Sequence, residues 1–170
     1  MKLITYSVFP SPFGNMAIAK SDVGICRIHF PEDAPFDHIL SKIYQTEVLQ
    51  EPRAFQDCIR QLKEYFDGKR RQFDLPIDLQ TTPFYKKALT EVQNIPYGKT
   101  ASYGEIAIRI QNPKAARAVG TANAQNPIPI IIPCHRVISH DGSLGGYGGK
   151  LERKMFLLEL EGVYYYTGDS

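Results

Sequence analysis

The stretch IPIIIPCHRVIS, residues 128–139, places a thiol beside an imidazole directly after a strongly apolar run. A cysteine attacks an electrophile as its thiolate, and a nearby base polarised by a carboxylate is a common way to obtain that anion. Because neighbouring side chains on an extended segment point to opposite faces, His135 need not touch the sulfur of Cys134, and a bridging water can connect them. Glu161 is the candidate carboxylate, and the amide of Asn126 can hold the segment's geometry. These residues predict cysteine chemistry, although a cysteine hydrolase would use similar parts.

The last helix explains why Glu161 is singled out. Residues 151–162, LERKMFLLELEG, have helical spacing that buries Leu151, Met155 and Leu158, and a glycine ends the helix. Glu161 lies in the last turn, where a carboxylate opposes the helix dipole. We therefore expect this carboxylate to have a specific partner.

A helix-turn-helix is predicted before the cysteine segment. Ser102 and Glu105 have the S-x-x-E spacing of a capping box, which makes Tyr103 the first residue of a short helix. Asn112 then serves as a cap and Pro113 opens a second helix, PKAARAVGTANA. Two short helices joined by so small a turn are typical of this motif.

The second of these helices is thin. It is built from small residues, namely Ala115, Ala116, Ala118, Gly120, Ala122 and Ala124. Arg117 is its only long side chain past the first turn. Such a helix can approach DNA closely, in the minor groove as well as the major groove. Taken without the cysteine segment, the same residues favour a helix packed tightly in the core, with Arg117 at its rim.

The first 80 residues predict a separate domain. Three short segments have the turn-bounded, apolar pattern of strands: residues 3–9, 16–20 and 24–30. Two helices follow them. Residues 74–82 have no helical period and form the connection. The sequence thus predicts an α+β protein with an N-terminal domain at 1–80 and a C-terminal domain at 83–170.

Composition and charge exclude several classes of protein. Of the 170 residues, 43% are hydrophobic and 22% charged, which is ordinary for a globular protein. No run approaches the length of a membrane-spanning helix, and the first residues lack the apolar core of a signal peptide. We expect a cytoplasmic protein, or a nuclear one in a eukaryote. Residues 83–170 carry ten Lys and Arg against seven Asp and Glu, so a polyanionic partner should meet this half.

The two other cysteines predict no chemistry. Cys26 and Cys58 are too few and too scattered for a disulfide scaffold and are interpreted as small buried hydrophobes. With His29 and His38 they lack the spacing of a zinc site. We therefore expect no metal and no other cofactor.

The half of the chain around Cys134 resembles the active-site domain of the O6-alkylguanine-DNA alkyltransferases, the methylated-DNA–protein-cysteine methyltransferases. The matching stretches are TPFYKKALTEVQNIPYGKTASYGEIA, NPKAARAVGTANAQNPIPIIIPCHRVI and GYGGKLERKMFLLELEG, of which NPIPIIIPCHRV is nearly diagnostic. The first 80 residues resemble the family's N-terminal domain only loosely. The resemblance implies a ribonuclease H-like N-terminal domain, with a small antiparallel sheet and helices. It also implies a mostly helical C-terminal domain with a winged-helix or helix-turn-helix motif.

The resemblance implies direct repair of double-stranded DNA. In the family, the PCHR cysteine accepts the alkyl group of O6-alkylguanine, or less readily O4-alkylthymine, as a thioether. Here that residue is Cys134, and the protein would act once. Asn126, His135, a water and Glu161 would activate the thiol. Tyr103 would help to rotate the damaged base out of the stack and donate a proton to guanine N3.

The resemblance also implies which residues meet DNA and the flipped base. Arg117 would fill the space that the base vacates. The other expected DNA contacts are Tyr103, Ala115, Ala116, Gly120, Asn123 and Arg136. The Gly-rich loop at 141–150 would close over the base, with contacts at Tyr147, Gly148, Gly149 and Pro129. Some relatives have a serine in place of Gly148, so a backbone donor must serve O6 here. We expect the protein to be a monomer.

Two other functions share parts of this pattern. A binding-only relative that flips and flags alkylated bases would replace the PCHR cysteine, usually with tryptophan, whereas this chain keeps Cys134. A helix-turn-helix regulator that responds to alkylation would usually carry an additional domain, for which 170 residues leave no room. Both are therefore weaker than direct repair.

Overall fold

The computed structural model describes residues 3–145, 147 and 150–166. The chain divides into two units, Met1–Leu79 and Gln80–Ser170. Within the described residues, no helix has the length and apolar character needed to cross a membrane. The α+β fold expected from the sequence is confirmed.

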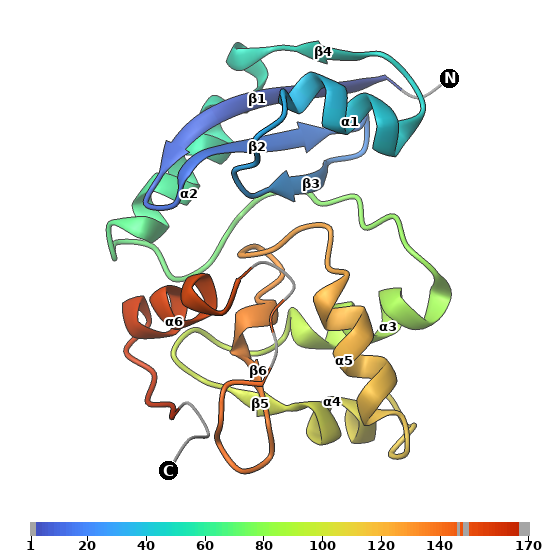
Figure 1. Ribbon diagram of the computed structural model, residues 1–170, viewed down its shortest axis with the longest axis vertical. Helices are drawn as coiled ribbons and strands as arrows, with labels where there is room; N and C mark the ends of the chain where they lie inside the picture. Colours follow the sequence, from blue (N-terminus) through green and yellow to red (C-terminus); the bar gives the residue numbers. More distant parts are fainter. Residues whose placement is uncertain (1–2, 146, 148–149, 167–170) are drawn as a thin grey trace. The chain divides into compact units, whose positions relative to one another are not determined.

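Unit 1 is built on a four-stranded sheet with the order β3–β2–β1–β4 (Figure 1). Its strands are β1 (Ile4–Ser11), β2 (Gly14–Lys20), β3 (Ile25–His29) and β4 (Val48–Gln50). The first three form the expected antiparallel sheet. The edge strand β4 adds a parallel pairing with β1 that the sequence did not predict, because three residues are too short to show an alternating pattern.

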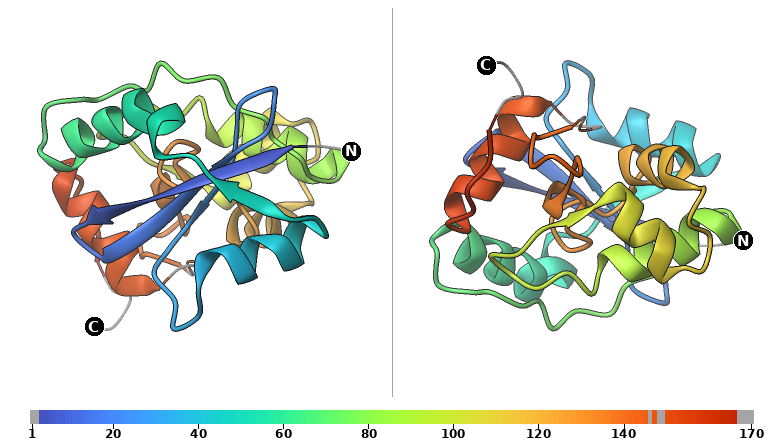
Figure 2. Two further views of the ribbon diagram at one scale, coloured as in Figure 1. Left: turned by 90° about the horizontal axis from the view of Figure 1, so that it is seen from above. Right: turned by 90° about the horizontal axis from the view of Figure 1, so that it is seen from below.

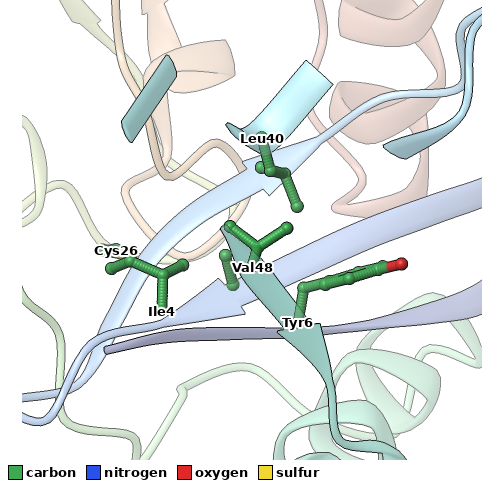
Figure 3. Close-up of a cluster of buried hydrophobic side chains, with 6 residues drawn as sticks. Ile4, Tyr6, Cys26, Leu40 and Val48 are labelled. Carbon is green, nitrogen blue, oxygen red and sulfur yellow. The ribbon is translucent and has the colours of Figure 1, made fainter. Parts of the chain in front are cut away.

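A hydrophobic core lies between this sheet and helix α1 (Phe36–Tyr44). Its buried residues are Ile4, Tyr6, Ala19, Cys26, Leu40 and Val48 (Figure 3). The 3-10 helix η1 (Pro52–Phe55) leads into α2 (Gln56–Phe66), and Figure 2 shows α1 and α2 on opposite sides of the sheet. Cys26 and Cys58 are both buried and free, in agreement with their interpretation as small core residues.

Unit 2 is mostly helical around one short pair of strands. Its elements are α3 (Pro83–Val92), β5 (Ala101–Ser102), α4 (Tyr103–Arg109), α5 (Ala116–Ala124), η2 (Cys134–Arg136), β6 (Val137–Ile138) and α6 (Leu151–Leu160). Strands β5 and β6 pair in parallel, with Ala101 beside Val137. Helix α3 packs against α4 and α5. Figures 1 and 2 show η2 and β6 between α5 and α6, so the cysteine segment lies at the centre of this unit.

The two helices of the predicted helix-turn-helix are present, but the second begins later than predicted. The capping box is confirmed: the Ser102 hydroxyl accepts from the Glu105 amide (3.0 Å), and the Glu105 carboxylate accepts from the Ser102 amide (3.3 Å). Helix α5 begins at Ala116, not at Pro113. The carbonyl of Asn112 accepts from the amide of Ala115 (3.0 Å), which closes a turn, so Asn112 is not the helix cap.

The inward face of helix α6 agrees with the prediction at Leu158, which is buried, and at Met155, which packs partly buried against the same cluster, but not at Leu151. Leu151, expected to be buried, is 44% exposed because it is the first residue of the helix and lies off the inward face. The buried positions are Lys154, Leu157 and Leu158, which have the i, i+3, i+4 spacing of one helical stripe. A lysine therefore points into the centre of the unit.

Candidate active site

The sequence suggested that Cys134 lies on an extended segment, but the residue lies on the 3-10 helix η2. The run before it turns: Ile130 has a φ of 76°, and the amide of Ile132 donates to the carbonyl of Ile128 (2.9 Å). The prolines in this run lack an N–H, so it cannot form a regular strand ladder. In a 3-10 helix successive side chains are about 120° apart, so the thiol and the next imidazole point in different directions.

His135 and Glu161 form a buried hydrogen bond of 2.7 Å between Nε2 and Oε2. Burial by itself raises the pKa of Glu161, but hydrogen bonds from His135 and Arg136 outweigh burial and lower this pKa to about 2. Burial lowers the pKa of His135, which favours the neutral imidazole. Because an ionised carboxylate can only accept, Nε2 carries the proton and Nδ1 is the unprotonated nitrogen. Nδ1 is buried without a hydrogen-bond partner among the described residues.

Arg136, expected among the DNA contacts, orients the same carboxylate. The side chain is buried, and its Nε and Nη2 donate to the two oxygens of Glu161 at 2.8 and 3.0 Å. Its Nη1 donates to the carbonyl of Ile95 (2.7 Å). The amide of Gly98 also donates to Glu161 (3.3 Å). These partners explain how a carboxylate is tolerated at the C-terminal end of α6.

The Cys134 thiol is fully buried among polar groups. Burial raises its pKa, and the neighbouring polar side chains of Asn126 and Tyr147, together with the charge of Lys154, oppose that rise. The amide of Asn126 also bridges the preceding turn: Nδ2 donates to the carbonyl of Ile132 (2.8 Å), and Oδ1 accepts from the amide of Ile128 (2.9 Å). Asn126 thus contacts the thiol and fixes the turn that carries it.

Asn123, also expected among the DNA contacts, is a second support of this segment. It lies on the inward face of α5 with 4% of its side chain exposed. Its Nδ2 donates to the carbonyl of Cys134 (3.0 Å). The helical spacing of Asn123 with buried Val119 and Ala122 is the signal that places it on the core side.

Lys154 is a site residue that sequence reasoning missed. Its ammonium is fully buried and donates to the carbonyls of Val137 (2.6 Å) and Leu144 (2.5 Å). Burial lowers its pKa to about 8, and the nearby charge of a Cys134 thiolate opposes that shift. The signal that could have found it is its position on the stripe of Leu157 and Leu158, since charged residues are rarely placed on an inward face without a role.

Tyr103 is half-buried between two close glycines. Its ring lies 3.7 Å from where a Cβ of Gly120 would be, and its hydroxyl 2.9 Å from where a Cβ of Gly145 would be. Gly145 also has a φ of 67°, so both its backbone and its surroundings require glycine. Burial, and then the charge of Cys134, raise the pKa of Tyr103, which keeps its phenol protonated and able to donate.

The remaining predicted residues fall into three groups. On α5 and at its start, Arg117 is exposed and Ala115 and Ala116 are partly exposed, so a surface made of them is accessible. Pro129, expected to contact the base, is buried in the turn before the cysteine. Gly148 and Gly149 lie outside the described residues.

Two family models match the chain. The model described as 6-O-methylguanine DNA methyltransferase, DNA binding domain, matches residues 83–163, and the model described as 6-O-methylguanine DNA methyltransferase, ribonuclease-like domain, matches residues 4–79. The chain belongs to the 6-O-methylguanine DNA methyltransferase family. The N-terminal half, which resembled this family only loosely, is therefore also part of it.

Relatives of the same family match over nearly their whole length. A methylated-DNA–protein-cysteine methyltransferase of Mycolicibacterium paratuberculosis is 42% identical, covering 94% of this chain and 93% of the relative. One from Methanosarcina acetivorans is 41% identical, covering 92% and 97%. The crystal structure of the Mycobacterium tuberculosis O6-methylguanine methyltransferase has a TM-score of 0.83 at 42% identity, covering 94% and 93%. The M. tuberculosis protein in complex with DNA has a TM-score of 0.82 at 42% identity, covering 92% of each chain.

As a member of the 6-O-methylguanine DNA methyltransferase family, the chain is a DNA-repair methyltransferase with a DNA-binding domain in unit 2. This confirms the function, fold and enzyme class expected from the sequence. The alternatives of a binding-only protein and of a regulator are not favoured, because the relatives matched here are named as methyltransferases.

Proposed function

We propose that Cys134 is the acceptor that takes the alkyl group from O6-alkylguanine, and less readily from O4-alkylthymine, in double-stranded DNA. The observation that supports this most directly is the hydrogen-bonded chain of Glu161 and His135 beside a buried thiol in a family of DNA methyltransferases. The sulfur attacks the alkyl carbon, a C–S bond forms, and the C–O bond to the base breaks. The product thioether has no leaving group that water can displace readily, so each molecule acts once.

The proton of the thiol needs a destination during this transfer. The unprotonated Nδ1 of His135 is the acceptor we propose, directly or through a water. Glu161 then stabilises the imidazolium through the 2.7 Å bond to Nε2. Tyr103 donates a proton to guanine N3, so that the base leaves as a neutral molecule. Asn126 keeps the thiol in place through its bonds to the flanking turn.

A base within a duplex cannot reach a buried thiol, so the damaged nucleotide must rotate out of the stack. We propose that α5 enters the groove, since its small residues Ala115, Ala116 and Gly120 permit close approach. Arg117 then fills the space left in the stack. Inside the site, Tyr147 contacts the base, with backbone donors expected at Gly148 and Gly149. Pro129 is proposed to line the base pocket from the buried turn.

All the residues in this scheme come from one chain, and we propose that the protein acts as a monomer. Its substrate places it where the cell keeps its DNA, in the cytoplasm or, in a eukaryote, the nucleus. Neither proposal requires a metal or a cofactor, because the thiol itself is the reagent.

The test is transfer of label from DNA to protein. A duplex that carries O6-methylguanine with a labelled methyl group is incubated with the protein, and the protein is then digested. We expect one labelled methyl per molecule on the peptide that contains Cys134, and no label with Cys134→Ala, which should still bind the duplex. Label that stays on the DNA, or label on another residue, would overturn the proposal.

A further inference from the structure

The segment after α6 returns along the turn at 141–144, which begins the Gly-rich loop. The amide of Leu144 donates to the carbonyl of Tyr166 (3.2 Å), and Ser143 and Tyr166 form a parallel bridge. The hydroxyl of Tyr166 donates to the carbonyl of Asp141 (2.6 Å). Its ring lies 3.3 Å from where a Cβ of Gly142 would be. Tyr166 is thus bonded to both ends of the turn at 141–144 and covers its middle.

The turn also has internal hydrogen bonds, which give it a fixed conformation against which Tyr166 packs. The amide of Ser139 donates to the carbonyl of Ser143 (3.0 Å), and the amide of Gly142 donates to the carbonyl of Ser139 (2.9 Å). The carboxylate of Asp141 accepts from the amide and the hydroxyl of Ser143 at 3.0 and 2.7 Å. A displacement of either end of the turn is therefore transmitted to the whole turn.

The segment that carries Tyr166 is itself anchored to α6. The amide of Val163 donates to the carbonyl of Leu158 (2.9 Å), and the hydroxyl of Tyr165 donates to Glu159 (2.5 Å). Val163 and Tyr165 also pack against the buried cluster of Ile138, Leu144 and Leu158. By contrast, the side chain of Tyr164 is 99% exposed. Position 164 therefore offers a matched tyrosine outside these contacts.

The residues after the turn lead directly into the site. The carbonyl of Leu144 accepts from the buried Lys154 (2.5 Å), and Gly145 lies against the hydroxyl of Tyr103. The side chain of Tyr147, two residues further, is close enough to Cys134 to lower the pKa of its thiol. The position of the turn therefore sets the position of the residues that face the reacting sulfur.

We propose that Tyr166 is a positioning residue for the alkylated base: by fixing the turn at 141–144, it sets where Leu144, Gly145 and Tyr147 meet the base. This inference rests on the proposed function, since it presumes that a base enters beside Cys134. Tyr166 acts only through the turn and touches neither the base nor the thiol. Its loss should weaken binding of the base in the pocket more than it slows the transfer step.

The test compares Tyr166→Ala, Tyr166→Phe and the control Tyr164→Ala in the full chain. Transfer from free O6-benzylguanine is followed over a range of concentrations, which separates the apparent dissociation constant from the limiting rate constant. A free base is used because it needs the pocket but not the DNA contacts. For Tyr166→Ala we expect the apparent dissociation constant to rise about fivefold to tenfold, as for the loss of one hydrogen bond and of the packing of the ring on the turn, with the limiting rate constant within about twofold of the wild type.

The other variants separate positioning from folding. Tyr166→Phe keeps the ring and the backbone bonds and loses only the hydroxyl. The free energy of base binding that it loses should therefore be about half of the loss in Tyr166→Ala. Tyr164→Ala should match the wild type. The inference is overturned if Tyr166→Ala and Tyr164→Ala have equal dissociation constants, or if the loss in Tyr166→Ala falls only on the limiting rate constant. A wild-type protein that gains neither a benzyl group from the free base nor a methyl group from an O6-methylguanine duplex would instead overturn the proposed function, so the two failures are distinguishable.

Discussion

Burial raises the pKa of the Cys134 thiol, so at neutral pH the loss of its proton has to accompany the alkyl transfer. The neighbouring side chains favour this loss of the proton. His135 offers an unprotonated nitrogen, Glu161 and Arg136 hold the imidazole in one orientation, and Lys154 places a positive charge near the sulfur. A buried, protonated thiol is also protected from oxidants and from other electrophiles, which react with exposed thiolates. The site therefore keeps its one reactive group for an electrophile that is brought inside.

Replacing Lys154 with Met should make this thiol harder to deprotonate. Met keeps most of the volume of the side chain but removes the charge that lowers the pKa of Cys134 and the two bonds to Val137 and Leu144. We expect the rate of alkylation by iodoacetamide at pH 7 to fall roughly tenfold and the pH–rate profile to move to higher pH. Lys150→Met, at an exposed position before α6, is the control and should leave the profile unchanged. An unchanged profile in Lys154→Met would mean that the ammonium serves only to hold the two carbonyls.

At the scale of elements, the sequence predicted those features that depend on nearby residues. The Ser102–Glu105 capping box was predicted correctly because its two partners lie within one helical turn. The start of α5 was missed because an asparagine before a proline is typical both of a helix cap and of a turn, and only packing decides between them.

The site shows the same division between local and tertiary information. Cys134, His135 and Glu161 were singled out by motif and helix position, and the structure brings His135 and Glu161 together. The inward direction of Arg136 and of Lys154 was not foreseen, because a charged residue is placed on the surface by default and its buried partners lie far away in the sequence. Partners such as the carbonyls of Ile95 and Val137 carry no sequence signal at all.

A substitution on helix α5 should affect the reaction with duplex DNA and leave the reaction with a free base nearly unchanged. If Arg117 fills the stack after the base has rotated out, Arg117→Ala should slow repair of O6-methylguanine in a duplex about tenfold or more, since flipping costs a few kcal/mol. Reaction with free O6-benzylguanine should change less than twofold, because a free base needs no filler. Lys114→Ala removes the same charge in the turn before the helix and should weaken duplex binding only modestly. Equal losses on both substrates in Arg117→Ala would contradict a role in flipping.

At the scale of the whole molecule, the site and the stability of unit 2 depend on the same buried groups. The residues that surround Glu161 come from the loop after α3, from η2 and from α6, so the carboxylate is paired only when the unit is folded. In the unfolded chain both Glu161 and His135 return to ordinary, solvated pKa values. Conditions that protonate them therefore favour the unfolded state, and stability and reactivity should be lost together in acid.

The direction of this pH dependence follows from the two pKa shifts. Burial lowers the pKa of His135, so as the pH falls through the usual range of histidine the unfolded chain takes up the first proton. The pKa of Glu161 is lowered from 4.5 to about 2, so its contribution is fully present above pH 4.5 and is lost as the pH falls toward 2. A shift of this size corresponds to about 3 kcal/mol in the free energy of unfolding.

Urea unfolding of the wild type, Glu161→Gln and Glu152→Gln at pH values from 7 to 3 tests this linkage. We expect the free energy of unfolding of the wild type to fall by on the order of 3 kcal/mol over this range. Glu161→Gln leaves the buried guanidinium of Arg136 without its carboxylate, so its stability at pH 7 should be lower by about 3 kcal/mol, and the readout is the slope with pH. That slope should flatten below pH 4.5 in Glu161→Gln and remain as in the wild type in Glu152→Gln, whose side chain is exposed. If Glu161→Gln retained the full wild-type slope below pH 4.5, the acid sensitivity would have to come from other carboxylates, and Glu161 would not be ionised and paired in the folded protein.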